Sequence, residues 1–199
     1  MQSDADKYEI ESHPWEPWLP RDAKVLFMGT FPPGSHRWSM DFYYPNPTND
    51  FWRIMGLLFL GDAQTLYIPE EKRFDLGLIK DLTLRHGIAM SDTVKKARRL
   101  RGNASDKFLE VIEGNDPADL LAAIPLCTDV ATTGEKAASV IAAITGTEAP
   151  AMGHYVVWTM PGGRCVRIWR LPSTSRAYPL RLEAKAGYYR KMLEIAGLL

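Results

Sequence analysis

The feature that most constrains the fold is the alternation of short apolar runs with segments of helical character. The apolar runs are short enough to be strands buried on both faces of a sheet, and they lie at 25–28, 87–90 and 129–132. Helical patterns fall between and after them, at 50–60, 74–85, 105–113, 117–124 and 135–145. This order is typical of a parallel sheet covered by helices. We therefore expect an α/β fold, a three-layer α/β/α sandwich with a short, mostly parallel central sheet.

The C-terminal third predicts a hairpin followed by a helix. Two apolar segments, 155–159 and 165–171, flank the turn-rich sequence Met160-Pro161-Gly162-Gly163-Arg164. Proline and glycine at that spacing favour a tight connection between antiparallel strands. A last helix is expected at about 181–197.

The length of 199 residues predicts one domain over 23–199, with residues 1–22 as an arm packed on it. No apolar stretch approaches the ~18 residues that a membrane helix needs, and the acidic beginning is unlike a leader peptide, so we expect a cytoplasmic protein. Cys127 and Cys165 lie in apolar, strand-like contexts and are predicted to be buried structural thiols. The histidines lack companions at ligand spacing, so no metal and no cofactor are expected, and we expect a monomer.

The formal net charge is zero, but the charge is unevenly spread. Residues 164–199 carry eight bases against two acids, whereas residues 102–150 carry two bases against eight acids. A second basic cluster falls at 95–101. If the two basic regions share a face they form a phosphate-binding track, and otherwise they are solvated loops.

Four stretches follow the ends of the expected strands: 29–49, 91–101, 133–136 and 171–178. In open parallel sheets the ligand-binding loops gather at the carboxyl ends of the strands. The first stretch begins Gly29-Thr30-Phe31-Pro32-Pro33-Gly34-Ser35, whose backbone N–H groups can face a ligand; the alternative is an ordinary strand-to-helix connection.

Residues 42–52 pack aromatic residues, prolines and amides just before a helix. Tyr44 can stack on a planar base while the Asn49 amide holds a water or a sugar oxygen. In the alternative, Thr48 or Asn49 is the N-cap of the helix and the aromatic residues belong to the core.

Taken in order, four motifs over residues 25–178 resemble the uracil-DNA glycosylase superfamily. The Gly29-x-x-Pro32 loop with its Tyr-Tyr-x-x-Pro-x-Asn-x-Phe-Trp segment is similar to the first motif region of that family, and 87–94 and 132–137 are similar to the second and third. Leu171-Pro172-Ser173-Thr174-Ser175-Arg176-Ala177 resembles the loop that enters the DNA minor groove, in a form closest to the hypoxanthine-DNA glycosylases, followed by the mismatch-specific uracil glycosylases.

The resemblance implies a DNA glycosylase that flips a deaminated base, uracil or hypoxanthine, out of damaged DNA and hydrolyses its glycosidic bond. Such a reaction needs a positioned water on one side of the sugar and hydrogen-bond donors at the departing base. The four motif loops contain no obvious lysine nucleophile, so we expect a monofunctional enzyme. Asn49 is the expected catalytic residue. The expected base-binding residues are Gly29, Thr30, Phe31, Pro32, Tyr44, Asp92 and Thr133, and the expected DNA-binding residues are Ser173, Thr174, Ser175 and Arg176.

Several of these residues have structural alternatives. Asp92 can accept from the base edge or, if protonated, donate to it; otherwise it caps a helix or pairs with an arginine such as Arg98. Ser173 and Ser175 can donate to phosphates while Arg176 fills the gap left by the extruded base, or the serines cap turns.

Two positions depart from the family pattern. Phe31 stands where the most active uracil enzymes have an aspartate, and Leu171 where many relatives have a histidine. A catalytically weak DNA- or nucleotide-binding module is therefore an alternative, and an enzyme acting on free nucleosides is another.

Overall fold

The computed structural model describes residues 8–100 and 108–199. The strands are β1 (Ile10–Ser12), β2 (Val25–Gly29), β3 (Tyr67–Ile68), β4 (Arg73–Phe74), β5 (Ile88–Asp92), β6 (Val94–Arg99), β7 (Leu109–Gly114), β8 (Asp129–Thr133), β9 (Tyr155–Thr159) and β10 (Cys165–Leu171). The helices are α1 (Phe51–Leu60), α2 (Leu76–Arg85), α3 (Pro117–Ala123), α4 (Glu135–Thr145) and α5 (Leu182–Ile195).

A five-stranded sheet with the order β5-β2-β8-β10-β9 forms the centre of the fold. Neighbouring strands run parallel except at β9, which pairs antiparallel with β10 as the predicted hairpin. Every residue of β2, β5 and β8 is buried, as the continuous apolar run at 25–28 predicted for β2, although β5 and β8 also bury polar residues. The α/β class and the mostly parallel sheet are thus confirmed.

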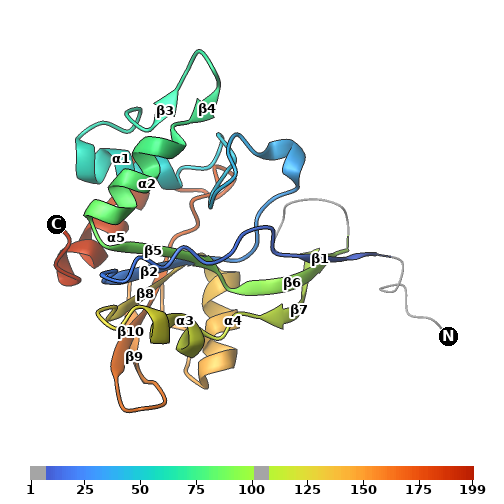
Figure 1. The fold of residues 1–199 in the computed structure, drawn as a ribbon, viewed down its shortest axis with the longest axis vertical. Coiled ribbons are helices and arrows are strands. Elements are labelled where there is room, and N and C mark those ends of the chain that lie inside the picture. Colours follow the sequence, from blue (N-terminus) through green and yellow to red (C-terminus); the bar gives the residue numbers. More distant parts are fainter. Residues whose placement is uncertain (1–7, 101–107) are drawn as a thin grey trace.

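Two apolar clusters cover opposite faces of this sheet. Phe27 packs in one cluster with residues of α1, α2 and α5, whereas its neighbours Leu26 and Met28 pack in the other with residues of α3 and α4. Successive strand residues point to opposite faces, so the two clusters lie on either side of β2. Figure 1 shows α1, α2 and α5 above the sheet and α3 and α4 below it.

A second sheet, with the order β1-β6-β7, corrects two predictions. Residues 109–113 of the expected helix at 105–113 belong to strand β7, and the remainder of that prediction lies mainly in residues that the structure does not describe. The expected loop at 91–101 contains strand β6. Antiparallel pairing of β6 with β7 satisfies both backbones, so tertiary pairing overrides the helical propensity of this segment.

The N-terminal segment lies along the outer edge of the central sheet. Trp18 and Met90 exchange backbone hydrogen bonds of 2.9 and 2.8 Å, and β1 pairs with β6. This segment covers the edge of β5, which would otherwise present unpaired backbone groups.

Cys127 is buried, and burial raises the pKa of its thiol to about 12. Cys165 is exposed, contrary to the prediction, because it begins β10 directly after the turn of the β9–β10 hairpin, where it pairs with the exposed Thr159. No helix within residues 8–100 and 108–199 has the length and apolar character needed to cross a membrane.

Candidate functional site

A pocket of about 560 Å³ opens at the carboxyl ends of β2, β5 and β8. Register places Gly29 opposite Asp92, and Thr133 ends the strand on the other side of β2. Of the twelve residues predicted for the site, the structure brings eleven together around this pocket: Gly29, Thr30, Phe31, Tyr44, Asn49, Asp92, Thr133, Ser173, Thr174, Ser175 and Arg176.

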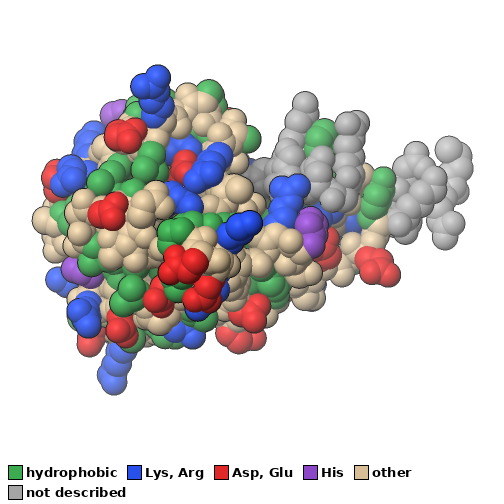
Figure 2. Space-filling view, turned by 90° about the horizontal axis from the view of Figure 1, so that it is seen from above, with side chains coloured by type: hydrophobic (Ala, Val, Ile, Leu, Met, Phe, Trp, Pro, Cys, Tyr) green, Lys and Arg blue, Asp and Glu red, His purple; other side chains and the backbone are tan. Residues whose placement is uncertain are grey.

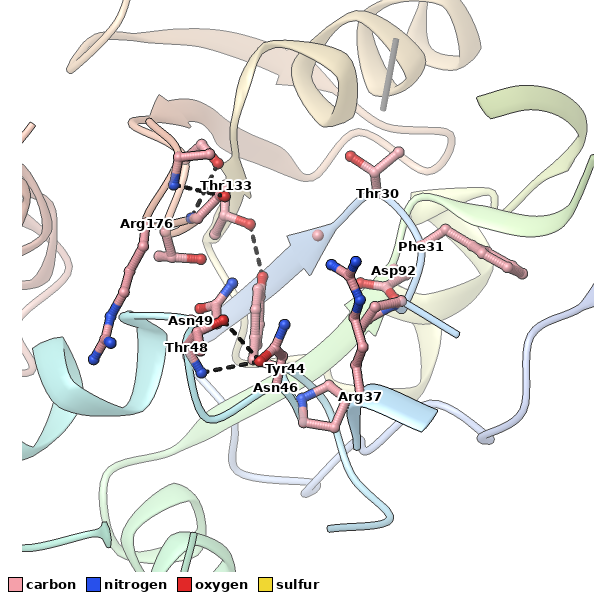
Figure 3. A pocket seen from close by; sticks show the side chains of 17 residues that line it. Thr30, Phe31, Arg37, Tyr44, Asn46, Thr48, Asn49, Asp92, Thr133 and Arg176 are labelled. Atoms are coloured by element: carbon pink, nitrogen blue, oxygen red, sulfur yellow. Dashed lines mark hydrogen bonds between the residues drawn. The ribbon is translucent and has the colours of Figure 1, made fainter. Parts of the chain in front are cut away.

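Pro32 does not line the pocket; it is buried, and its carbonyl accepts a hydrogen bond from Arg99. Phe31 contributes to the wall, but its ring points away from the other labelled side chains (Figure 3). The ring contacts His13 edge-on at 5.6 Å and lies 5.3 Å from the Arg99 guanidinium. The hydrocarbon at this position therefore packs behind the site.

The floor of the pocket requires a glycine at position 29. A Cβ atom there would lie 2.6 Å from Asp92 Oδ1 and 3.2 Å from the Tyr44 hydroxyl. Both contacts are too short, so a side chain would push Asp92 or Tyr44 out of place.

The backbone, the ring and the hydroxyl of Tyr44 are each constrained. Its backbone has a φ of 52°, its ring stacks on Phe51 at 3.9 Å with an 8° interplanar angle, and its hydroxyl lies 2.8 Å from Thr133 Oγ1. Burial raises the pKa of Tyr44 well above its ordinary value, so the phenol stays neutral. Phe51 covers one face of the Tyr44 ring. The Tyr44 side chain also lines the pocket.

Asn49 makes a local contact at the start of α1 and also lines the pocket, while the N-cap of the helix is Asp50 and not Thr48 or Asn49. In this contact, Asn49 Oδ1 accepts from the Phe51 backbone N–H at 2.8 Å. The side chain nevertheless lines the pocket, where Nδ2 has two hydrogens to donate and Oδ1 a second lone pair. Asn46 makes the same type of bond, from Thr48 N to Asn46 Oδ1 at 2.9 Å.

The loop at 172–178 is fastened to the start of α1. Asn49 and Ser175 form an isolated backbone bridge, and the Asp50 N–H donates to the Thr174 carbonyl at 2.9 Å. Within the loop, the hydroxyls of Ser173 and Ser175 accept from the N–H groups of Ser175 and Ala177, the turn-capping role considered from the sequence. Thr174 is 2% exposed, so a ligand reaches little of it.

Three charged residues form what we call the Asp50 cluster: Asp50, Arg176 and Lys185. Lys185 is fully buried and donates to Asp50 Oδ2 and to the Ser175 carbonyl, each at 2.8 Å. Arg176 Nε lies 3.2 Å from Asp50 Oδ1, with about half of its side chain exposed at the pocket rim. The cluster therefore joins α5, the 172–178 loop and the residue next to Asn49.

Asp92 pairs with neither a helix end nor Arg98. Its Oδ2 lies 2.9 Å from His13 Nε2, and the two side chains are 8% and 6% exposed. Burial alone would lower the pKa of His13, but the hydrogen bond and the charge of Asp92 outweigh it, and the pKa is raised. Arg98 instead pairs with Glu110 at 2.9 Å.

Sequence reasoning missed His13 because nothing in the local sequence links it to a residue 79 positions away. It also missed Arg37 and Thr48, which line the pocket. Leu171 is buried in the apolar cluster beside α5 and does not line the pocket.

The two basic regions lie far apart in the fold, as far as the described residues show. Figure 1 places β6 and α5 at opposite ends of the molecule. Many of the bases are also used within the fold: Lys95 and Lys96 pair with Glu113, Arg167 with Asp129, and Arg164 donates to three carbonyls. Figure 2 accordingly shows basic and acidic side chains interspersed over the face in view.

Among residues 8–100 and 108–199, no group of three or more His, Cys, Asp or Glu side chains is placed to hold a metal ion. No family profile and no curated protein match the sequence. Among solved structures, the chain is similar to a protein from Methanosarcina acetivorans described as "a putative Uracil DNA glycosylase", with 21% sequence identity and a TM-score of 0.60. The match covers 94% of this chain and 99% of that one. The chain therefore shares the α/β fold of that protein over nearly its whole length.

Proposed function

We propose that this chain is a monofunctional DNA glycosylase that extrudes a deaminated base, uracil or hypoxanthine, and hydrolyses its N-glycosidic bond with water. The observation that carries the proposal is the pocket itself, which brings an aromatic ring, an amide and a carboxylate together beneath the 172–178 loop. The two apolar clusters on opposite sheet faces support the three-layer arrangement expected for such an enzyme.

Each polar group suits one part of the chemistry. The face of Tyr44 away from Phe51 offers a base a flat stacking surface. The second lone pair of Asn49 Oδ1 can accept from a water and orient its oxygen for attack on an oxocarbenium-like centre. Because that centre is strongly electrophilic, a positioned water needs little activation. The bond from the water oxygen to the sugar carbon forms as the N-glycosidic bond breaks, and the proton of the water goes to the departing base anion or to solvent.

Water is favoured over an amine as nucleophile. No lysine within the described residues lines the pocket. Lys185, beside the loop, is fully buried and bonded to Asp50, and Lys95 and Lys96 pair with Glu113. A lyase reaction needs a free amine to form a Schiff base, which supports monofunctional hydrolysis.

The second candidate is a binding module that retains the pocket without the chemistry. It is favoured by the local bond of Asn49, which engages its carboxamide oxygen with Phe51 N. A module of this kind would bind base-containing DNA without forming abasic sites.

Oligonucleotides carrying uracil, hypoxanthine or xanthine, followed by alkali treatment and electrophoresis, test the proposal. We expect alkali-dependent cleavage at uracil or hypoxanthine, and its loss with Asn49→Ala. Tight binding without cleavage at any of the three bases would support the binding module instead.

Salt dependence distinguishes a DNA substrate from a free nucleoside. A DNA-bound protein loses affinity steeply with added salt, because phosphate contacts release counterions, whereas a nucleoside site shows a flat response. Arg176→Ala should flatten the slope of log affinity against log salt by about one. An unchanged slope would show that Arg176 does not contact a DNA phosphate.

A further inference from the structure

Asp92, which lines the pocket, forms a buried pair with His13, which lies outside the pocket lining and comes from a distant part of the chain. His13 comes from the segment after β1, and Asp92 ends β5. Their 2.9 Å contact uses Asp92 Oδ2, while Asp92 Oδ1 lies over the Cα of Gly29 at the pocket floor. One carboxylate oxygen is thus held by the N-terminal segment, and the other belongs to the pocket.

The surroundings of His13 favour an imidazolium that donates from both nitrogens. Nδ1 lies 2.8 Å from the Trp15 carbonyl, and Nε2 faces Asp92. Rings of Tyr43, Trp15 and Phe31 enclose it with centroid distances of 5.6–5.7 Å. The Trp15 N–H is also 3.2 Å from Nδ1, a weaker contact that only the neutral tautomer can accept.

The charged and titratable groups that face His13 are few. Asp92 on β5 is in direct contact, Glu16 on the same segment adds a smaller negative charge, and Tyr43 stacks on the ring as a neutral phenol. From β6, the Lys95 backbone carbonyl accepts from the His13 N–H, while the Lys95 ammonium pairs with Glu113.

We propose that His13 is a positioning residue that holds Asp92 as a hydrogen-bond acceptor, so that the pocket selects bases presenting a ring N–H. This inference rests on the proposed function and deepens it. With His13 donating to Oδ2, the pocket-facing Oδ1 of the carboxylate acts as the acceptor for the base. Of the two roles that the sequence left open for Asp92, this proposal takes the acceptor.

A ring N–H is what deamination creates. Adenine and cytosine carry a bare ring nitrogen beside their amino group, and that lone pair is repelled by a carboxylate oxygen. Hypoxanthine and uracil carry an N–H at the same position, beside a carbonyl. This N–H can donate to the carboxylate oxygen. Guanine and thymine also carry this N–H, so their rejection falls to the shape of the pocket.

The variants His13→Phe and His13→Gln separate positioning from packing. Phenylalanine keeps a ring among Tyr43, Trp15 and Phe31 but cannot donate to Asp92, whereas the glutamine amide can. Excision is compared on duplexes containing hypoxanthine and its analogue purine, which has a bare nitrogen in place of the N–H. We expect His13→Phe to reduce the hypoxanthine-to-purine ratio of kcat/KM by about 10–100-fold, the scale of a hydrogen bond to a charged group, and His13→Gln to restore much of it. An equal fall on both substrates would overturn the inference, because it signals a structural role.

Two measurements keep the test independent of catalysis. If wild type excises neither base, the same ratio is taken from equilibrium binding to the two duplexes, so that failure of the glycosylase proposal is not mistaken for failure of this one. The ring pKa of His13 is followed by NMR in the DNA-free protein. A pKa that falls in Asp92→Asn supports the pair, and one that does not change overturns it.

Discussion

Two carboxylates flank the pocket on opposite sides, and each is held by a buried cation of a different kind. On one side Asp92 pairs with His13; on the other Asp50 pairs with Lys185 and Arg176 (Figure 3 shows Arg176 and Asp92 across the pocket from each other). Imidazole changes its charge near neutral pH, whereas ammonium and guanidinium groups ordinarily do not. The comparison separates a side that we propose to contact the base from a side that fixes the backbone carrying Asn49.

The two sides also differ in what their cations hold. Lys185 donates to a loop carbonyl as well as to Asp50, so it joins α5 to the 172–178 loop. His13 holds one side-chain oxygen and leaves the backbone of β5 to its strand partners. We therefore expect variants of the Asp50 cluster to alter stability most, and variants around Asp92 to alter selectivity most.

The largest effect is expected from Lys185→Met. Removing the buried ammonium leaves Asp50 with only the half-exposed Arg176, and breaking a buried ion pair in this way typically costs about 3–5 kcal/mol of unfolding free energy. Denaturant unfolding measures the loss. The double variant Lys185→Met with Asp50→Asn should recover a large part of it, since no buried charge is then left behind; a double variant as unstable as the single one would contradict the pairing.

The next effect concerns Asn49, which lies between the two sides. If it positions the attacking water, Asn49→Ala should lower kcat by about 10²–10³ while the affinity for substrate DNA changes little, because the interaction matters mainly in the transition state. Asn46→Ala is a matched control, since both amides accept an i+2 backbone N–H. Single-turnover excision and thermal melts on both variants decide the matter. Equal rates for the two variants would exclude Asn49 as the catalyst.

Tyr44 should show an intermediate effect. Tyr44→Ala removes a stacking face and is expected to weaken binding to base-containing DNA by about 1–3 kcal/mol. Tyr44→Phe keeps the ring on Phe51 and loses only the bond to Thr133, so it should be mild. Titrations with base-containing and abasic duplexes separate the two roles. An equal loss on abasic DNA would show that Tyr44 only packs the fold.

The smallest effect is the pH dependence that distinguishes the two ion pairs. Because the pKa of His13 is raised in the folded protein, its pairing stabilises fully below the unfolded pKa of about 6.5, and this contribution is lost as pH rises through the folded pKa. The stability difference between wild type and His13→Gln should therefore shrink from pH 6 to pH 9, whereas that for Lys185→Met should stay nearly constant. Unfolding curves across this range measure the stability difference for each variant. A difference for His13→Gln that does not change with pH would show that the His13–Asp92 pair does not titrate in this range, like the Asp50 cluster.

The local pattern of the sequence determined most of the central fold. The bounds predicted for β9, β10 and α4 agree with the structure, because strand alternation and helix periodicity are properties of neighbouring residues. The site loops followed from the same pattern, since parallel strands bring their carboxyl ends to one edge of the sheet. Eleven of the twelve predicted site residues accordingly line one pocket, whatever their individual roles.

The tertiary structure alone decided what holds the site residues. The segment at 109–114 has helical propensity, yet it becomes β7 because β6 offers it a backbone partner. The partners of Asp92 and Asp50 lie 79 and 135 residues away along the chain. A buried carboxylate must find a cation, but which cation is set by how the elements dock and not by spacing along the sequence. The sequence thus determined where the pocket forms, and long-range packing decided that one carboxylate is held by a histidine and the other by a lysine and an arginine.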